Sequence, residues 1–390
     1  MTTAVPEKPP VQAPLLFVAG AIGVALLFAI QESSTLRAWL FVVGLGLGFS
    51  LYHASFGFTA AYRNAMVGKD LSGVAAQAVM LVLAMSLFAP FLSVGEIAGH
   101  RASPTIAPIS VAMLSGAFIF GIGMQIGNGC ASGTLFTTGG GSTRMVITLI
   151  FFCIGSWWGT LDIYGWRALP NFGAYSLGKM YGYGPAVAIQ TVFLGVVIYG
   201  LYRWGARLQK PLWWNGGFSW QKVMLGPWPL LLGGISLALL NFAHLAVTGR
   251  AWGVTFGFTI WGAKGMEALG WDPDTSKFWS QKWAASALNN PILESGVSVS
   301  NIGIVVGAAV AATLASKFRP TLKIGWGPLL AAIIGGLAMG YGARLAYGCN
   351  IGAFFAGVVS TSLHGWAWLG MALLGSVIGI RLRPIFGLGK

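Results

Sequence analysis

Long apolar segments recur along the whole of this chain of 390 residues, and only short polar connections separate them. A helix needs about 20 apolar residues to cross the hydrocarbon core of a bilayer, so each segment is a candidate transmembrane helix. The segments with the length to span cover residues 14–30, 72–94, 107–126, 143–161, 184–202, 226–247, 299–315, 325–345 and 365–382. The sequence therefore predicts an all-α polytopic membrane protein with about nine transmembrane helices.

The charge of the chain supports this class. Charged residues make up 8% of the sequence, whereas a water-soluble domain carries roughly 25%. The net charge of +14 comes from 23 Lys and Arg against 9 Asp and Glu, and the basic residues are scattered between the apolar segments. Such scattering indicates topology signals rather than a surface for nucleic acid. We expect membrane lipid around the protein and no nucleic-acid partner.

The titratable residues limit the chemistry of the chain. All 9 acidic residues fall in or beside polar connections, so no carboxylate is available in mid-span as a proton relay. The 3 cysteines and 4 histidines show no metal-ligand spacing, and the chain has no Walker motif. We expect no metal, no cofactor and no enzymatic activity.

An internal repeat organises the chain. Three blocks recur in the same order, namely residues 55–59 with 255–259, 121–136 with 340–355, and 155–159 with 375–379. The longest block aligns without gaps, and its glycines and its cysteine coincide. We predict two related halves, residues 1–180 and 225–390, joined by a linking helix and a basic cytoplasmic loop over residues 181–224.

The basic clusters predict how these halves are oriented. The clusters in residues 203–222, 317–323 and 381–390 are all predicted to face the cytoplasm. The number of spans between these clusters agrees with this only if residues 252–266 enter and leave the membrane on the same side. The repeat then predicts the same path for residues 38–61. Each half then has about four spans, and a single span links them. The halves are therefore predicted to be inverted, an architecture that recurs in transporters.

Each half contains a glycine-rich segment with one cysteine, and we predict that both segments are re-entrant loops. The glycines able to break a helix there are Gly129, Gly133, Gly348 and Gly352. The N-terminus of a half-helix attracts anions, and Cys130 and Cys349 would add polarizable thiols that are weak donors. This combination suits an anion with a terminal sulfur. The alternative is tight helix crossings with cysteine as a small hydrophobe, but the twinned frames favour function.

A second group of candidate residues surrounds the repeated Phe-Gly-Phe-Thr sequence. The residues predicted to line a constriction are Phe56, Gly57, Phe58, Phe256, Gly257 and Phe258. Arg63 and Lys264 would place positive charge near its mouth. Gln125 and Arg344 share one repeat position, five residues before each cysteine, and Arg344 is predicted to attract anions. The alternatives are lipid-facing aromatics, topology charges and a snorkelling arginine. Cys153 has no counterpart, and we predict that it only packs.

These motifs resemble the YeeE/YedE family of bacterial thiosulfate transporters over about residues 44–383. The resemblance rests on the Gly-x-Gly-Cys and Tyr-Gly-Cys-Asn-Ile-Gly frames and on the Phe-Gly-Phe-Thr-Ala-Ala-Tyr-Arg element that ends at Arg63. It implies an hourglass-like, multi-pass unit in the bacterial inner membrane, in which Cys130 and Cys349 relay thiosulfate by transient S–H···S contacts. Family members often carry a third cysteine where this chain has Gly57. In some members a soluble sulfurtransferase accepts the sulfur, and some relatives are associated with other sulfur compounds and with selenium.

The sequence therefore predicts an inner-membrane permease for thiosulfate or a related small sulfur-containing anion. An alternative from another class uses the same two cysteines. In that reading the chain is a membrane-embedded thiol redox or sulfur-transfer enzyme, whose thiolates would be stabilised by the nearby helix N-termini.

Overall fold

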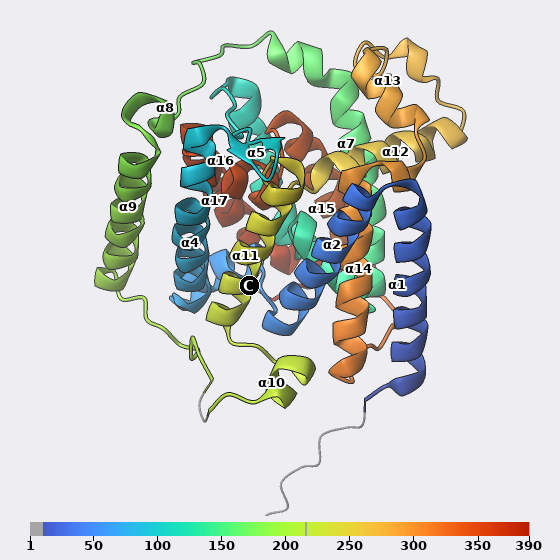
Figure 1. Ribbon diagram of the computed structural model, residues 1–390, viewed down its shortest axis with the longest axis horizontal. Coiled ribbons are helices and arrows are strands. Elements are labelled where there is room, and N and C mark those ends of the chain that lie inside the picture. Colours follow the sequence, from blue (N-terminus) through green and yellow to red (C-terminus); the bar gives the residue numbers. More distant parts are fainter. Residues whose placement is uncertain (1–10, 215–216, 390) are drawn as a thin grey trace, which may run out of the picture.

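The computed structural model describes residues 11–214 and 217–389, and helices make up most of this length (Figure 1). Its strands are a short hairpin of β1 (Glu96–Ile97) and β2 (His100–Arg101). The helices are α1 (Ala13–Ser33), α2 (Thr35–Ala54), α3 (Phe58–Gly68), α4 (Ser72–Val94), α5 (Val111–Gly127), α6 (Ala131–Gly139), α7 (Thr143–Arg167), α8 (Leu177–Tyr181), α9 (Tyr183–Arg203), α10 (Trp220–Leu225), α11 (Leu230–Thr248), α12 (Thr255–Ala268), η1 (Pro273–Thr275), α13 (Lys282–Asn289), η2 (Ile292–Glu294), α14 (Gly296–Leu314), α15 (Trp326–Leu345), the π-helix η3 (Asn350–Phe355), α16 (Ala356–Val359), α17 (Leu363–Leu382) and η4 (Arg383–Phe386).

Ten helical stretches within the described residues are long and apolar enough to cross a membrane. This confirms the all-α, multi-pass class. The additional span arises because α2 is an unbroken helix of 20 residues, so the predicted same-side entry of residues 38–61 is not confirmed. α2 runs parallel with α14, since Gly44 lies against Ser300 and Gly48 against Ile304. The other predicted same-side segment contains α12, which is not among the ten stretches.

The glycines of the repeat are explained by four close contacts at two helix crossings. A Cβ atom on Gly121 of α5 would lie 2.2 Å from the carbonyl oxygen of Ala372 in α17, and one on Gly375 would lie 2.1 Å from that of Phe118. The same contacts recur between α15 and α7. There, Cβ atoms on Gly340 and Gly155 would lie 2.2 and 2.3 Å from the carbonyl oxygens of Phe152 and Leu337. Glycine lets these backbones touch.

The helix pairings follow the same twofold pattern. α5 packs on α17 as α15 packs on α7, α2 packs on α14 as α11 packs on α4, and α1 lies against α14 as α9 lies against α4. Figure 1 shows α1 and α9 on opposite flanks of the bundle. The division into halves stays a prediction. These pairings favour placing α9 in the second half as the counterpart of α1, which gives five spans to each half.

The two Gly-Cys segments interrupt spans, and re-entrant loops are not confirmed. α5 ends at Gly127 and is followed by its C-cap residue Asn128, whose backbone is left-handed with φ 67°, and α6 begins after Cys130. Correspondingly, Tyr347 has φ 62° and Gly348 has φ 148° before η3 begins after Cys349. Residues 111–139 form one candidate span and residues 326–359 another. The glycines and the left-handed turns thus break two transmembrane helices in their middle.

We expect Gly375→Ala to destabilise the protein, because its methyl group would overlap the carbonyl oxygen of Phe118. Overpacking of this kind costs about 1–3 kcal/mol or more. Thermal unfolding of the purified protein, followed by size-exclusion chromatography, measures the effect. Gly370→Ala in the same helix is the control, since no atom lies within 4 Å of its Cβ position. Equal stability of the two variants would contradict the crossing.

Candidate functional site

Each of the two repeat cysteines caps the helical segment that follows it. Cys130 and Cys349 both have extended backbone at the N-cap position, and both are buried, at 1% and 0% exposed. The Sγ atom of Cys130 accepts from the N–H of Gly133 at 3.4 Å, and that of Cys349 accepts from the N–H of Ile351 at 3.4 Å. The first N–H groups of a helix have no partner in the helix, so an N-cap side chain normally binds one of them. Here thiols do so.

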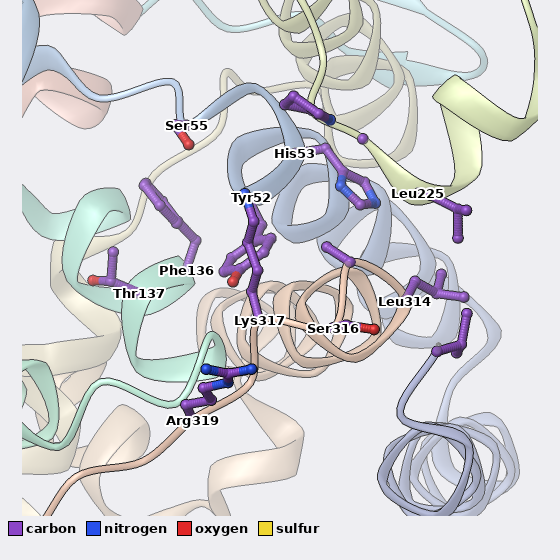
Figure 2. A pocket seen from close by; sticks show the side chains of 14 residues that line it. Tyr52, His53, Ser55, Phe136, Thr137, Leu225, Leu314, Ser316, Lys317 and Arg319 are labelled. Carbon is purple, nitrogen blue, oxygen red and sulfur yellow. The ribbon is translucent and has the colours of Figure 1, made fainter. Parts of the chain in front are cut away.

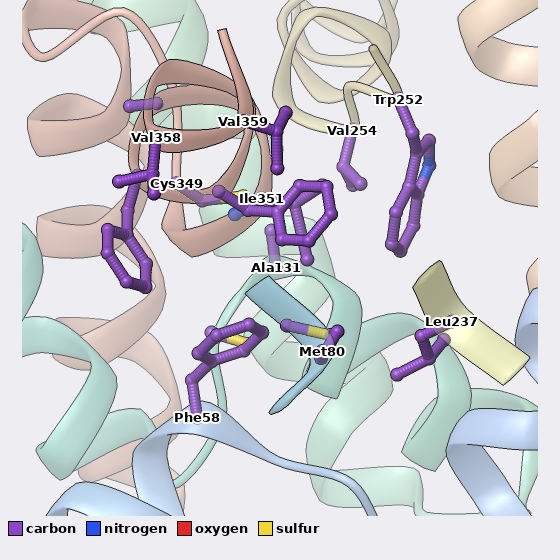
Figure 3. Close-up of a cluster of buried hydrophobic side chains, with 14 of the residues drawn as sticks. Phe58, Met80, Ala131, Leu237, Trp252, Val254, Cys349, Ile351, Val358 and Val359 are labelled. Carbon is purple, nitrogen blue, oxygen red and sulfur yellow. Dashed lines mark hydrogen bonds between the residues drawn. The ribbon is translucent and has the colours of Figure 1, made fainter. Parts of the chain in front are cut away.

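Two further helix starts lie beside the cysteines. α3 begins directly after Gly57, and the backbone of Phe58 lies close to the sulfur of Cys130. α12 begins shortly after Gly253, whose Cα would lie 4.0 Å from a Cβ on Gly352. Figure 3 shows side chains of these elements gathered around Cys349, with Phe58, Ala131 and Val254 labelled. Since every helix N-terminus carries partial positive charge, this centre is suited to an anion.

The centre also contains buried polar groups without partners. The side chain of Asn350 is 0% exposed, and neither its Nδ2 nor its Oδ1 has a hydrogen-bond partner. The buried hydroxyl of Tyr62 is also unpaired, and Tyr62 lies close enough to Asn350 and Cys130 to interact with both. Leaving such groups unpaired costs roughly 1–3 kcal/mol each, so they are available to a ligand. Sequence reasoning missed both residues, although they adjoin Cys349 and Arg63 in the quoted motifs.

The aromatic residues of the Phe-Gly-Phe-Thr repeat are mostly internal. Phe56, Phe58 and Phe258 are at most 2% exposed, so these three do not face lipid. Phe58 packs edge-on against Phe354, with ring centroids 6.3 Å apart. Phe256 is half-buried and lines a cavity described below.

The two glycines of this repeat are not equivalent. A Cβ on Gly57 would meet nothing within 4 Å, and Gly57 lines a small cavity of about 50 Å³. A Cβ on Gly257 would lie 2.6 Å from Nδ2 of Asn301. The difference arises because α3 begins after Gly57, whereas α12 begins two residues before Gly257.

The predicted polar residues divide into two groups. Arg63 donates to Oδ1 of Asn128 at 3.0 Å, and buried Gln125 donates to the carbonyl of Thr59 at 3.2 Å. Both therefore join α3 to the broken helix that carries Cys130. The corresponding polar side chains of the second half, Arg344 and Lys264, do not join the equivalent elements.

Arg344 lies over the ring of Phe278 at 5.2 Å, and its Nε has no partner. Lys264 donates to the carbonyl of Leu288 at the end of α13, so it caps a helix and does not line the centre. Gln125 and Arg344 share a repeat position but make different contacts.

Two cavities lie at opposite ends of the bundle. The larger, of about 640 Å³, lies beside α10, and Figure 2 shows Thr137, Lys317 and Arg319 at its wall. The other, of about 480 Å³, lies beside α13 and is lined by Arg250 and Gly253. We call these the α10 cavity and the α13 cavity. No group of three His, Cys, Asp or Glu side chains in the described part of the chain could hold a metal ion.

Both cavities lead toward the cysteines. The α10 cavity is lined by Ser55, which lies two residues before Gly57, and by residues of α6, the helix that Cys130 caps. The α13 cavity reaches Gly253, which is adjacent to Gly352 in the turn after Cys349. Each cavity is therefore lined by residues that lie near one of the two cysteines.

Relatives of the chain have been identified by sequence. It is 28% identical over 342 residues to a protein of Spirochaeta thermophila named thiosulfate transporter TsuA. The aligned residues cover 83% of this chain and 92% of that relative. It is also 31% identical over 175 residues to the probable transporter YedE of Escherichia coli, and 29% identical over 177 residues to that of Salmonella typhimurium. These two matches cover 43% and 45% of this chain and 42% of each relative.

The family model described as Sulphur transport matches residues 53–378. This range contains the four helix starts, both capping cysteines and most of the residues that line the two cavities. Its relatives are named as transporters and not as enzymes. The chain is therefore a multi-pass membrane protein that belongs to the Sulphur transport family.

Proposed function

We propose that this protein conducts thiosulfate, or a related small sulfur oxyanion, across the bacterial inner membrane through the cysteine centre. The observation that carries the proposal is the pair of buried thiols that cap two broken helices, each of which accepts from a backbone N–H of the helix that follows. A relative that covers most of this chain is named a thiosulfate transporter. The cysteine relay, implied above by family resemblance, fits this arrangement.

The proposed path joins the two cavities. From the α13 cavity it passes Gly253 and Gly352 to Cys349, and then reaches Cys130. From there it passes the open space at Gly57 into the α10 cavity. The predicted cytoplasmic side of the α10 end makes this the inward direction.

The centre offers an anion two kinds of contact. Backbone N–H groups at the helix starts, the hydroxyl of Tyr62 and the amide of Asn350 can donate to oxygens. The thiols can make polarizable contacts with a terminal sulfur. The surrounding side chains are apolar, including Met80, Leu237 and Trp252 (Figure 3). A strongly hydrated ion would lose more on entering such a centre than a soft anion with a sulfur terminus.

The proposal also includes the aromatic wall and the soluble partner that were predicted from the sequence. Phe56, Phe58 and Gly57 form the wall on the α10 side, and Phe256 lies on the α13 side. The alternative of a thiol redox or sulfur-transfer enzyme is not favoured, because the relatives are named as transporters. A soluble sulfurtransferase would meet the cargo at the α10 cavity, where Lys317 and Arg319 provide positive charge.

We expect Cys130→Ala and Cys349→Ala each to reduce thiosulfate uptake to background, because each removes the sulfur from its helix start. The measurement is uptake of radiolabelled thiosulfate into a bacterial strain that lacks its own importers. Cys153→Ala is the matched control, since Cys153 lies in α7 and its carbonyl meets Gly262 of α12. Uptake at the wild-type rate in both test variants would refute the relay.

We expect Tyr62→Phe and Asn350→Leu to reduce transport without reducing the stability of the protein. Each removes a buried polar group without a hydrogen bond, so the midpoint of thermal unfolding should stay constant or rise. Thiosulfate uptake should fall about tenfold, as expected when one hydrogen bond to a charged cargo is lost. Undiminished uptake in both variants would show that these groups do not contact the cargo.

A further inference from the structure

Three arginine side chains from distant parts of the chain meet at the end of α5. Arg63 comes from α3, Arg144 from the first turn of α7, and Arg383 from the start of η4. We call these three residues the arginine triad. Nη1 of Arg63 and Nη1 of Arg383 donate to the same atom, Oδ1 of Asn128, at 3.0 and 3.1 Å. The side chain that they share belongs to the left-handed residue that ends α5.

The acceptors of the triad are neutral oxygens. Nη2 of Arg144 donates to the carbonyl of Ile126 at 3.1 Å, and Nη1 of Arg383 donates to that of Gln125 at 2.6 Å. The charged groups that act on Arg383 are Arg63 and Arg144, which repel it. In the described ranges, no carboxylate forms an ion pair with any of the three. Within residues 11–214 and 217–389, the triad therefore concentrates positive charge, and the third acceptor of Arg383 is also neutral, since its Nε donates to the carbonyl of Gly389.

Capping of α5 explains only part of this arrangement. A helix C-terminus attracts cations, but its dipole amounts to about half an elementary charge. Three guanidinium groups exceed that charge several times over. Arg383 is also only 6% exposed, so little water reaches it. Charges this close to an apolar interior are costly unless an opposite charge joins them.

We propose that the arginine triad is an oxyanion-binding subsite, which holds the oxygen end of the cargo while its terminal sulfur faces Cys130. This inference rests on the proposed function and names how the same path binds its substrate. Only Gly129 separates Asn128 from Cys130 in the chain. Guanidinium groups bind oxyanions through paired N–H donors of fixed geometry. The triad thus recognises oxygen, and the thiols recognise sulfur.

The subsite belongs to one end of the path. The turn before Cys349 has Tyr347 where the turn before Cys130 has Asn128, so it lacks the amide oxygen that two arginines share. The arginine on that side, Arg344, lies over the ring of Phe278. Arg144 lies shortly after Gly141 in the sequence, and Gly141 lies close to Phe318. Phe318 belongs to the loop beside the α10 cavity, so the triad lies near that loop. Cargo would meet the triad on the α10 side of Cys130.

The test uses sulfate and thiosulfate as probes of the purified full-length protein, with dissociation constants measured by isothermal titration calorimetry. We expect Arg63→Gln and Arg383→Gln each to weaken binding of both anions about tenfold or more. The KM of thiosulfate uptake should rise by a similar factor. Arg381→Gln is the matched control, because Arg381 is exposed and lies two residues from Arg383 in sequence. Its affinities should equal those of the wild type.

Arg63→Gln is the deciding variant, because Arg63 is half-buried and its hydrogen bond goes to a side chain. Unchanged sulfate affinity in this variant would overturn the subsite, as would the absence of binding of either anion to the wild type. Sulfate lacks the terminal sulfur, so Cys130→Ala should keep sulfate binding while it loses thiosulfate uptake. A wild type that binds sulfate through Arg63 but takes up no thiosulfate would refute the transport proposal and retain the subsite.

Discussion

Free backbone N–H groups in an apolar interior are the constraint on which the rest of this structure depends. A transmembrane helix normally satisfies its own backbone, and a break in mid-membrane leaves several donors without partners. Here two spans break, and a thiol accepts from one N–H at each break at 3.4 Å. Sulfur is a weak acceptor, so each start is capped only loosely, and the anion binding proposed for this centre draws on that. A serine or aspartate at the same position would satisfy the backbone more fully.

The close helix crossings make such breaks tolerable. α5 is held against α17, and α15 against α7, by glycines that bring carbonyl oxygens to the helix surface of the neighbour. Buried backbone contact of this kind replaces the lipid contacts that a lone broken helix would have to make. Unpaired polar side chains then survive at the centre, where Asn350 and Tyr62 have no partner.

Much of this arrangement could be predicted from the sequence, because a repeat shows which residues share one environment. The twinned glycine frames predicted breaks in the helices beside Cys130 and Cys349, and the structure shows such breaks, with each cysteine at an N-cap position that the sequence did not predict. Periodicity could not show that α2 is unbroken, because its glycines resemble helix breakers when read in isolation. They lie instead at a crossing with α14.

The other contacts of the site could not be predicted from the sequence, for physical reasons. Arg383 reaches Asn128 across 255 positions of sequence, a contact that no local pattern reports. Tyr62 and Asn350 are notable for the hydrogen bonds that they fail to make, which requires knowledge of their surroundings. Lys264 and Arg344 were given roles by symmetry. The segment around α13 has no counterpart in the first half, and it supplies both with other partners, Leu288 and Phe278.

The crossings at Gly121, Gly155, Gly340 and Gly375 have a mechanical consequence. Each joins a helix of the predicted first half to a helix of the predicted second half through backbone atoms in contact. Rocking one half against the other, as alternating-access carriers do, would have to break all four contacts in every cycle. A frame locked in this way favours passage by small side-chain movements at a fixed constriction. Under the proposed function, a frame that does not rock would leave accumulation to depend on how quickly the cell consumes the arriving anion.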